Sequence, residues 1–461
     1  MTTYDALREQ HLKDLERLLP AYTQRLDWPA EEIASAQEEG LRRIAGLAKA
    51  ASPWHAERLR AIDPGLLTLD DLGRLPTMTK DDLMAHWDAI VTDRRLNLDL
   101  GEAHLETLTG DAYLLDRYHV VASGGSSGRR GVFVYGWDAW AVCYAGFMRW
   151  LIRRARRDPE LRGRPLVQAS VTAEVGSHMS SAGAQTFSNT EMPVHRFPVT
   201  LPLDEIVTGL NAVQPHVLQG YPSALHGLVR EVGRRRLTIS PRLIVTRSEP
   251  LLPETRAALE EAWHAPVLNC WGSSEGGATG VSCGEAPGVH LSEDLLIIEP
   301  VDEAGRAVPP GETAAKVYLT NLYNNALPLI RYELNDEVAV LTAPCPCGSA
   351  FVRAGDPQGR ADDAFTYGSR LTVHPHVFRS PLGRERSIVE YQVRQTERGA
   401  EISVRCAGAV DLDALTRTVC DYLEQAGLAD PEVSIVSVDQ IGRSRVGKLK
   451  RFVPLSRAVV Q

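Results

Sequence analysis

Short apolar runs alternate with helical stretches from about Arg117 to Ala339, and this alternation limits the fold more than any other feature of the chain. Five runs have the composition of strands: 118–122, 131–135, 165–171, 243–246 and 266–269. Between and after them, two segments have the apolar spacing of helices: 223–235 and 253–263. Strands that alternate with helices are typical of parallel sheets. We therefore expect a large α/β domain built on a largely parallel sheet.

After Arg360 the pattern changes. The elements that follow read as a β-hairpin, a helix and a further strand, over 389–395 with 401–406, then 413–425 and 433–438. A block of this kind forms a small α+β domain of its own. We therefore expect an N-terminal domain over 1–360 and a C-terminal domain over 361–461.

Composition narrows the class of protein. The 461 residues are 44% hydrophobic and 24% charged, with a net charge of −9, which is ordinary for a globular enzyme and gives no reason to expect nucleic acid. Two basic runs, 149–157 and 234–236, are interpreted as solvated helix faces. The first residues resemble no secretory signal, and apolar stretches stay short of the roughly 20 residues of a membrane span. Seven scattered cysteines favour reduced thiols.

We therefore expect a cytoplasmic protein without nucleic-acid or membrane partners. Residues 5–50 carry leucines at helical spacing and predict amphipathic helices with a structural role. The oligomeric state is open, with a homodimer as one option.

The loop over 123–131 reads Ser-Gly-Gly-Ser-Ser-Gly-Arg-Arg-Gly and lies between two predicted strands. Glycine lets a backbone approach phosphate oxygens closely, while serine hydroxyls and a basic side chain donate hydrogen bonds to them. The loop does not fit the GxxxxGK[ST] pattern of kinases and NTPases, nor does the long helix of that motif follow it. Taken alone, it indicates a phosphate site or a plain surface turn.

Further motifs follow in a fixed order: Gly220-Tyr221-Pro222-Ser223, Ser248-Glu249-Pro250, Trp271-Gly272-Ser273-Ser274-Glu275, Leu329-Ile330-Arg331-Tyr332-Glu333-Leu334-Asn335-Asp336, Gly359-Arg360-Ala361-Asp362 and Gly447-Lys448. With the loop, this order resembles the acyl-adenylate-forming superfamily. The phenylacetate-CoA ligase group within it also shows a Leu-Pro-x-x-x-Lys element, matched here at 75–80. The resemblance covers nearly the whole chain. It implies that a small carboxylic acid, aromatic in the group's name, is activated by ATP and Mg²⁺ as acyl-AMP and transferred to coenzyme A.

The resemblance implies roles for individual residues. The phosphate loop would use Ser123, Ser126, Ser127, Gly128 and Arg129, although the family usually has Thr-Thr-Gly-Lys where this chain has Ser-Ser-Gly-Arg. The adenylate would contact Ser248, Glu249, Pro250, Trp271, Ser274, Asp336 and Arg360. Among these, Trp271 would stack on adenine, Ser274 would meet the α-phosphate and Asp336 would bind the ribose. Glu275 would hold Mg²⁺, which prefers carboxylate oxygens together with nucleotide phosphates.

In the C-terminal domain, Lys448 resembles the lysine that bridges the substrate carboxylate and the α-phosphate, with Lys450 as the runner-up. Asp362 resembles the hinge about which a mobile lid rotates, and a plain turn or helix cap is the alternative. The acyl group could instead pass to a carrier protein or an amine. From another class, the chain could be a zinc-stabilised, nucleotide-binding homologue without catalysis, a reading that the catalytic-looking Lys448 opposes.

A separate group of residues concerns zinc. Cys283, His290, Cys345 and Cys347 are the strongest Cys/His grouping in the chain. Their spacing alone is unconvincing, because zinc-binding pairs usually lie two to four residues apart and free cysteines are often core residues. Members of the phenylacetate-CoA ligase group with the same order carry zinc, so the resemblance implies a structural Zn²⁺ site.

Overall fold

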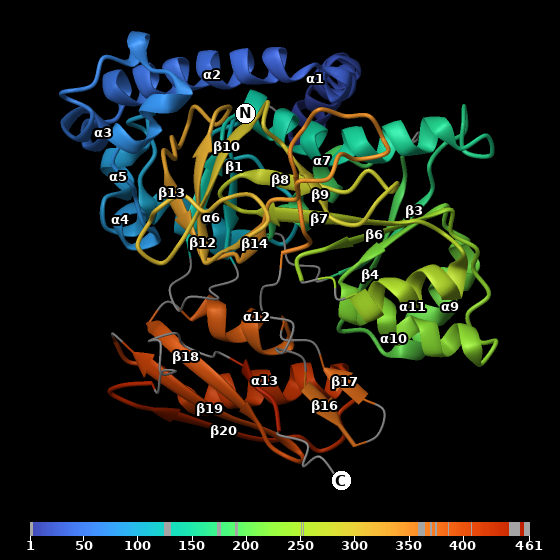
Figure 1. Ribbon diagram of the computed structural model, residues 1–461. Helices are drawn as coiled ribbons and strands as arrows, with labels where there is room; N and C mark the ends of the chain where they lie inside the picture. The colour runs from blue at the N-terminus through green and yellow to red at the C-terminus, as the bar shows by residue number, and fades with distance from the viewer. Residues whose placement is uncertain are drawn as a thin grey trace.

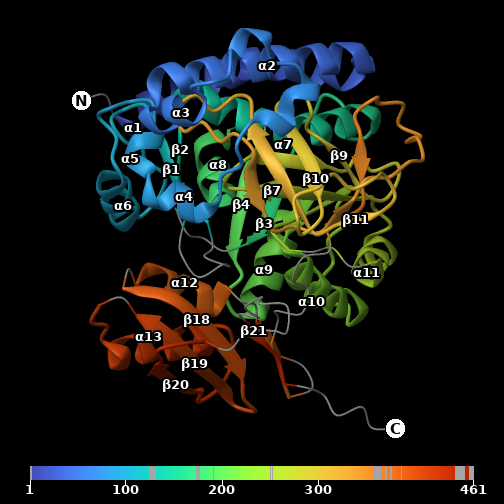
Figure 2. The same cartoon turned by 60° about the vertical axis from the view of Figure 1, so that its left-hand side comes forward.

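The computed structural model describes residues 3–123, 131–172, 177–189, 192–249, 251, 253–357, 365–368, 371–373, 376–385, 387–406, 408–441 and 452–455. The elements form a large group, blue through yellow to light orange in Figure 1, and a small C-terminal group in darker orange and red below it. Figure 2 shows the same separation after a 60° turn.

An eight-stranded sheet forms the centre of the large group. Its order is β15 (Arg353–Ala354), β9 (Val289–Leu291), β8 (Gly277–Val281), β7 (Val267–Ser273), β6 (Leu243–Arg247), β5 (Val217–Gly220), β3 (Gln168–Thr172) and β4 (Val194–Pro198). The pairs from β4 to β7 are parallel, as the alternation of strands and helices predicts. The pairs among β7, β8, β9 and β15 are antiparallel, so the sheet is mixed rather than largely parallel.

Helices cover both faces of this sheet. They are α7 (Trp137–Arg157), α8 (Met179–Phe187), α9 (Leu203–Val213), α10 (Pro222–Gly233) and α11 (Pro253–Trp263). On β6, Ile244 packs in a core cluster with residues of α9, α10 and α11. Leu243 and Val245 instead pack in a cluster with α7. Because successive side chains of a strand point to opposite faces, the odd-numbered residues of β6 face α7.

The N-terminal segment contributes α1 (Tyr4–Gln24), α2 (Ala30–Ala51), α3 (Pro53–Arg58), α4 (Lys80–Ala85), α5 (Trp87–Ile90), α6 (Leu98–Thr107) and 3-10 turns at Arg25–Asp27, Pro64–Leu66 and Leu69–Arg74. The predicted leucine stripe of α1 is confirmed, since Leu15 is buried and Leu12, Leu18 and Leu19 pack against the same core. Figure 1 shows α1 and α2 lying across the top of the large group.

Smaller sheets complete the large group: β1 (His119–Ala122) with β2 (Val132–Tyr135), β10 (Leu296–Val301) with β12 (Lys316–Asn321) and β13 (Tyr332–Leu334), and β11 (Thr313–Ala314) with β14 (Val338–Ala339). Strands β1 and β2 are antiparallel neighbours, and Ala122 pairs with Val132 at the end where the glycine-serine loop joins them. The sheet pairing therefore holds the two ends of that loop together.

The C-terminal group contains β16 (Phe365–Tyr367), β17 (Leu371–Val373), α12 (His376–Arg384), β18 (Ile388–Gln395), β19 (Gly399–Cys406), α13 (Leu412–Gln425), β20 (Glu432–Ser437) and β21 (Phe452–Val453). The predicted hairpin, helix and strand are confirmed as β18 with β19, α13 and β20. Their side chains form a core of their own. Asp356, by contrast, is tied to the large group, to β7 through Asn269 and to α11 through Arg256.

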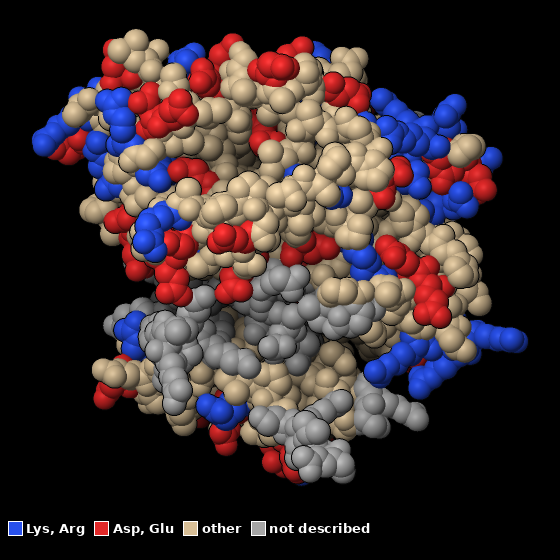
Figure 3. All heavy atoms as spheres, viewed as in Figure 1, with Lys and Arg blue, Asp and Glu red and all other residues tan. Residues whose placement is uncertain are grey.

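The basic run over 149–157 is only partly the solvated face that the sequence indicates. Arg149 is completely buried, and both of its terminal nitrogens bind Asp294 at 2.8 Å. The prediction of a solvated face was wrong for Arg149, because this residue lies on the side of α7 that faces the core, where it pairs with the carboxylate of Asp294. Figure 3 shows Lys and Arg gathered where the C-terminal end of α7 lies, with acidic side chains beside them. Among the described helices, none is both long enough and apolar enough to span a membrane.

Candidate functional site

The base of the glycine-serine loop is held by Ser123 and Gly131. The hydroxyl of Ser123 accepts a hydrogen bond from the amide of Gly131 at 2.9 Å and another from Nζ of Lys80 at 3.0 Å. Lys80 is the first residue of α4, whose start is fixed by a capping box between Thr79 and Asp82. A cation is therefore anchored at the mouth of the loop. Ser126, Ser127, Gly128 and Arg129, predicted to bind phosphate, lie outside the described residues.

The turn after β7 carries Ser274 and Glu275. The hydroxyl of Tyr135 donates to the carbonyl of Ser274 at 2.8 Å, and the side-chain amide of Asn321 donates to the carbonyl of Glu275 at 3.0 Å. Gly277 closes the turn with φ +65°, and a Cβ there would lie 2.6 Å from Sγ of Cys143. Glycine suits this position because it adopts positive φ freely and leaves room for a neighbour.

Burial and two neighbouring charges shift the pKa of Glu275, and the two charges act in opposite directions. Burial raises the pKa of its carboxyl above the usual range, the ammonium of Lys80 opposes this rise, and Asp336 adds to it. Burial and the charge of Glu275 raise the pKa of Tyr332. Lys80, Glu275 and Asp336 therefore share one electrostatic environment, which can bind a metal ion together with phosphate.

The segment 75–80 is docked on the segment that carries Asp336. The amide of Met78 donates to the carbonyl of Arg331 at 3.1 Å, and the amide of Glu333 donates to the carbonyl of Met78 at 2.9 Å. This pairing brings Lys80 next to the site. Asp336 itself accepts a hydrogen bond from the indole N–H of Trp271 at 3.0 Å.

Trp271 and Asp336, predicted to contact adenine and ribose, are thus brought into direct contact by the fold. The tryptophan is only 6% exposed, so most of its ring is covered by protein. Ser248 and Glu249 follow directly after β6, and Ser248 adopts the left-handed conformation with φ +67°, which is uncommon for serine. The predicted contacts Pro250, Arg360 and Lys448, and the hinge residue Asp362, lie outside the described residues.

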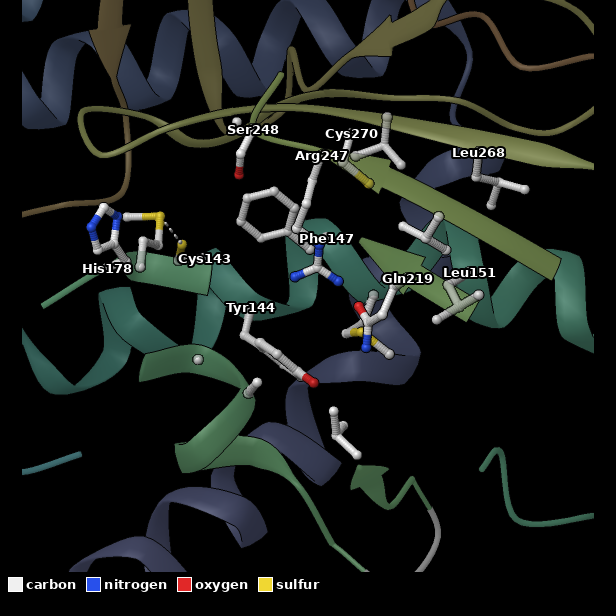
Figure 4. A pocket seen from close by; sticks show the side chains of 18 of the residues that line it. Cys143, Tyr144, Phe147, Leu151, His178, Gln219, Arg247, Ser248, Leu268 and Cys270 are labelled. Atoms are coloured by element: carbon white, nitrogen blue, oxygen red, sulfur yellow. Dashed lines mark hydrogen bonds between the residues drawn. The ribbon is translucent and has the colours of Figure 1, made fainter. Parts of the chain in front are cut away.

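A cavity of about 150 Å³ begins beside the turn that carries Ser274 and runs between α7 and the sheet. Ser248, Gly272, Ser273 and Ser274 line one end, and its walls include Trp140, Phe147, Met148, Leu151 and Leu268. Burial raises the pKa of Cys143 to about 12 and that of Cys270 to about 11, so both lining thiols stay protonated. Further polar groups in its lining belong to Tyr144, Gln168, His178, Gln219 and Arg247. Figure 4 shows Arg247, Gln219 and Tyr144 pointing into it.

The four residues of the predicted zinc site are brought together by the fold. The ligand atoms of Cys283, His290, Cys345 and Cys347 all lie within 4.8 Å of one another. Nδ1 of His290 lies 3.1 Å from the carbonyl of Phe351, and its Nε2 faces Sγ of Cys347 at 3.4 Å. A ring that donates from Nδ1 presents a free Nε2, which is the usual arrangement around a metal-binding histidine. This cluster can hold a tetrahedral metal ion.

Sequence reasoning attached no role to four of the residues in the site: Lys80, Gln168, Gln219 and Arg247. Lys80 was visible within the Leu-Pro-x-x-x-Lys element. Arg247 could have been recognised from its position, because it is a charged residue at the end of an apolar strand. The carboxyl ends of parallel strands are where α/β proteins bind ligands.

No protein-family model matches the chain. It is 27% identical over 462 residues to a phenylacetate-coenzyme A ligase of Thermus thermophilus, and the alignment covers 93% of this chain and 98% of that protein. The chain is a homologue of phenylacetate-coenzyme A ligase. It is also 21% identical over 284 residues to the protein CapK of Staphylococcus aureus, covering 59% of this chain and 55% of CapK.

Solved structures agree with this homologue relationship at the level of the fold. A 2-hydroxyisobutyryl-CoA ligase in complex with 2-HIB-AMP and CoA superposes with a TM-score of 0.61 at 22% identity, covering 94% of this chain and 91% of that one. The same ligase in its postadenylation state gives a TM-score of 0.58 at 21% identity, with the same coverage. The predicted fold class, a large adenylate-forming domain followed by a small C-terminal domain, is confirmed.

Proposed function

We propose that this protein is an AMP-forming acid-thiol ligase, which activates a carboxylic acid with ATP and transfers the acyl group to coenzyme A. The observation that carries the proposal is the meeting of two features. Trp271, Glu275, Asp336 and Lys80 gather at one point, and a cavity with apolar walls opens beside it at Ser274. Homology to phenylacetate-coenzyme A ligase along nearly the whole chain supports the same activity.

In the first step, an oxygen of the substrate carboxylate attacks the α-phosphorus of ATP, and pyrophosphate leaves with the electrons of the broken P–O bond. Both partners are anions, so the site has to hold them in line and offset their charge. Lys80 and the loop that starts at Ser123 would bind the departing phosphates. Asp336 would accept hydrogen bonds from the ribose hydroxyls, for which its two carboxylate oxygens are suited.

In the second step, the thiolate of coenzyme A attacks the acyl carbon, and AMP leaves as the C–O bond to its phosphate breaks. Ser274 lies at the end of the cavity, where the acyl carbon and the α-phosphate would meet. The hydroxyl of Tyr135 fixes the backbone of this turn through the carbonyl of Ser274. We therefore expect the turn after β7 to hold the acyl-AMP in the orientation that the thiolate attacks.

Two metal ions belong to the proposal. Mg²⁺ fits Glu275, because that carboxylate is buried beside the proposed phosphate position and hard cations take oxygen ligands. When bound, Mg²⁺ would offset phosphate charge. Zn²⁺ fits Cys283, His290, Cys345 and Cys347, since three thiols and an imidazole form a closed structural site that leaves no position for substrate.

The proposal also includes a C-terminal lid over 361–461 that supplies Lys448 in the first step. The separate core of the C-terminal group supports a domain of this kind, and the ties of Asp356 to the large group put its start beyond that residue. A carrier protein or an amine stays the alternative acceptor, and a homodimer stays a prediction. A cytoplasmic location fits reduced cysteines.

The test is acid-dependent exchange of labelled pyrophosphate into ATP, with a panel of carboxylic acids and Mg²⁺. Mass analysis of the products with and without coenzyme A identifies the acceptor. We expect exchange with at least one acid and a thioester only when coenzyme A is present. Exchange without thioester would favour a carrier protein or an amine. Failure of every acid would favour the inactive nucleotide-binding homologue.

A further inference from the structure

Three adjacent strands send polar side chains to the face of the sheet that packs on α7. Gln168 begins β3, Gln219 lies on β5 and Arg247 ends β6. Their strand neighbours alternate as expected, since Val217 and Val245 pack in the α7 cluster and Leu218 and Ile244 in the opposite one. In Figure 4 the guanidinium of Arg247 and the amide of Gln219, from adjacent strands, lie near each other in the cavity. These polar groups therefore lie together in the cavity, whose other walls are mostly apolar.

These groups are not satisfied within the described part of the protein. Gln219 donates to Oε1 of Gln168 at 3.3 Å, which leaves the amide nitrogen of Gln168 buried without a partner. Nε of Arg247 is also buried without a partner. Among the described residues that line the cavity, none is acidic. Arg247 is only partly buried, yet its guanidinium has five N–H donors, so an anionic partner beside it would be favourable.

Other arginines of the chain show what a structural role looks like. Arg149 binds both oxygens of Asp294, and Arg331 binds Glu299 with two of its nitrogens. Arg256 reaches Asp356 at 3.0 Å. Each of these partly or fully buried cations has a carboxylate of the protein itself. Among the described residues, no carboxylate pairs with Arg247, and the cavity lies where such a partner would stand.

A nucleotide is not the partner that this geometry favours. The side chain of Arg247 extends between Phe147 and Gln219, toward the hydroxyl of Tyr144 (Figure 4). The guanidinium thus lies among the walls that would surround the tail of the acid. A carboxylate is the best match for it, because a guanidinium presents parallel N–H donors in a fixed fork.

We propose that the cavity selects a dicarboxylic acid, whose second carboxylate is bound by Arg247 with donors from Gln168 and Gln219. This inference rests on the proposed ligase activity and specifies its substrate class. The carboxylate to be activated lies at the Ser274 end, and the second carboxylate lies among the three polar side chains. A volume of about 150 Å³ is close to that of a cavity known to hold benzene, so the acid has to be small, with at most a single ring or a short chain between its carboxylates.

The experiment compares matched acids in the pyrophosphate-exchange assay. The probes are adipate against hexanoate and terephthalate against benzoate, within a wider panel of mono- and dicarboxylic acids of four to eight carbons. We expect kcat/KM for the best dicarboxylic acid to exceed that of its matched monoacid more than tenfold, since hydrogen bonds to a charged group are strong. The 6-hydroxy analogue of hexanoate tests whether charge is needed, and it should behave like the monoacid.

Arg247→Met should abolish this preference, with a loss of at least tenfold for the dicarboxylic acid and an equal or higher kcat/KM for the monoacid. Arg247→Lys should keep part of it. The ratio of two substrates within one variant does not depend on how much protein is folded, so a partial folding defect leaves the test valid. Arg306→Met is the matched control, because Arg306 lies on the surface with its side chain 81% exposed.

The remaining outcomes distinguish a failure of the proposed substrate class from a failure of the proposed ligase activity. Exchange with monoacids equal to or better than with dicarboxylic acids would overturn the substrate class and leave the ligase activity standing. A dicarboxylic preference that survives in Arg247→Met, or a variant that raises KM for ATP alike with all acids, would overturn the role of Arg247. Absence of exchange with every acid in wild-type protein would instead overturn the proposed function on which this inference rests.

Discussion

At the scale of single residues, Glu275 and Asp336 carry the proposed nucleotide site. We expect Glu275→Gln and Asp336→Ala each to lower pyrophosphate exchange by more than tenfold, because losing a charged hydrogen-bond partner costs about 1.5–3 kcal/mol. Trp271 donates to Asp336, so the second variant also leaves its indole N–H without this acceptor. Glu303→Gln, in an exposed turn, is the control. Exchange at the wild-type rate in both variants would contradict the assignment of these carboxylates.

A second prediction at this scale concerns His55. Its ring is 3% exposed, and Nε2 donates to the carbonyl of Pro328 at 3.0 Å. Burial lowers the pKa of His55 from 6.5 to about 4, and the nearby charge of Arg58 adds to the effect. Between these two values the unfolded chain binds a proton that the folded protein does not. The free energy of unfolding should therefore fall as the pH is lowered from about 6.5 to about 4.

The contribution of His55 is on the order of 3 kcal/mol over this window. It is measured by comparing denaturant unfolding of wild-type protein and His55→Gln at several pH values. Other groups titrate in both proteins, so the quantity to compare is the difference between the two slopes. We expect a shallower slope in the variant. Parallel curves would mean that His55 keeps its ordinary pKa in the folded protein.

The sequence motifs named several residues of the proposed nucleotide site but not the polar residues of the cavity beside it. The motif around Trp271 and Glu275 pointed to a nucleotide site, and the structure joins it to Asp336. Arg247 could not be assigned from the sequence, because its meaning depends on the absence of a carboxylate among the described cavity walls. A missing partner is a property of three-dimensional packing, which local sequence patterns do not record.

At the scale of elements, the periodicity of single segments predicted helices and the C-terminal hairpin well. The antiparallel edge formed by β8, β9 and β15 was not predicted, because strands of two to five residues are too short to show a period and pair with distant segments. The same long-range pairing brings Cys345 to Cys283 with 3.5 Å between their sulfur atoms. Spacing along the chain could not show this.

The Cys/His cluster yields a prediction for these elements. We expect one zinc ion per chain, and Cys345→Ser should lower both metal content and thermal stability, since structural sites contribute directly to folding free energy. Turnover of the surviving folded protein should change less. Cys406→Ser, which alters a partly buried cysteine at the end of β19, is the control. Metal analysis that finds no zinc in protein prepared without chelators would refute this prediction.

The buried ion pair between α7 and the segment before β10 is a second test at this scale. Arg149 and Asp294 both have completely buried side chains, so Arg149→Met leaves a carboxylate without its main partner. We expect a loss of about 3–5 kcal/mol in the free energy of unfolding, partly recovered by adding Asp294→Leu. Arg306→Met, which breaks an exposed pair with Asp302, should cost less than about 1 kcal/mol. Equal losses in the two arginine variants, measured by denaturant unfolding, would contradict this account.

At the scale of the whole molecule, the proposed function requires two parts with separate cores. The described C-terminal elements bury their own apolar side chains, while the large group holds the proposed nucleotide-binding residues and the cavity. A small domain with its own core can change orientation without unfolding either part. This arrangement suits two reactions that need different groups over one site, first a cation between two anions and then access for a thiol.

The last prediction separates those two reactions. Lys448 and Asp362 lie outside the described residues, and their roles come from the sequence motifs. If Lys448 offsets the charge of the carboxylate and the α-phosphate, Lys448→Ala should nearly eliminate acyl-AMP formation, while supplied acyl-AMP should still react with coenzyme A. Asp362→Pro should show the reverse, because a restricted hinge impairs the rotation that thiolation needs.

Single-turnover assays of each step in both variants make the comparison, with Lys450→Ala as the neighbouring control. If the loss of adenylation appears in Lys450→Ala instead, the bridging role moves two residues along the chain. Equal losses in both steps for Lys448→Ala would mean that the lysine is structural or that the domains do not alternate. Because the acyl-AMP is supplied chemically in the second assay, a defect there cannot be inherited from the first step. The two half-reactions therefore report independently on the lid.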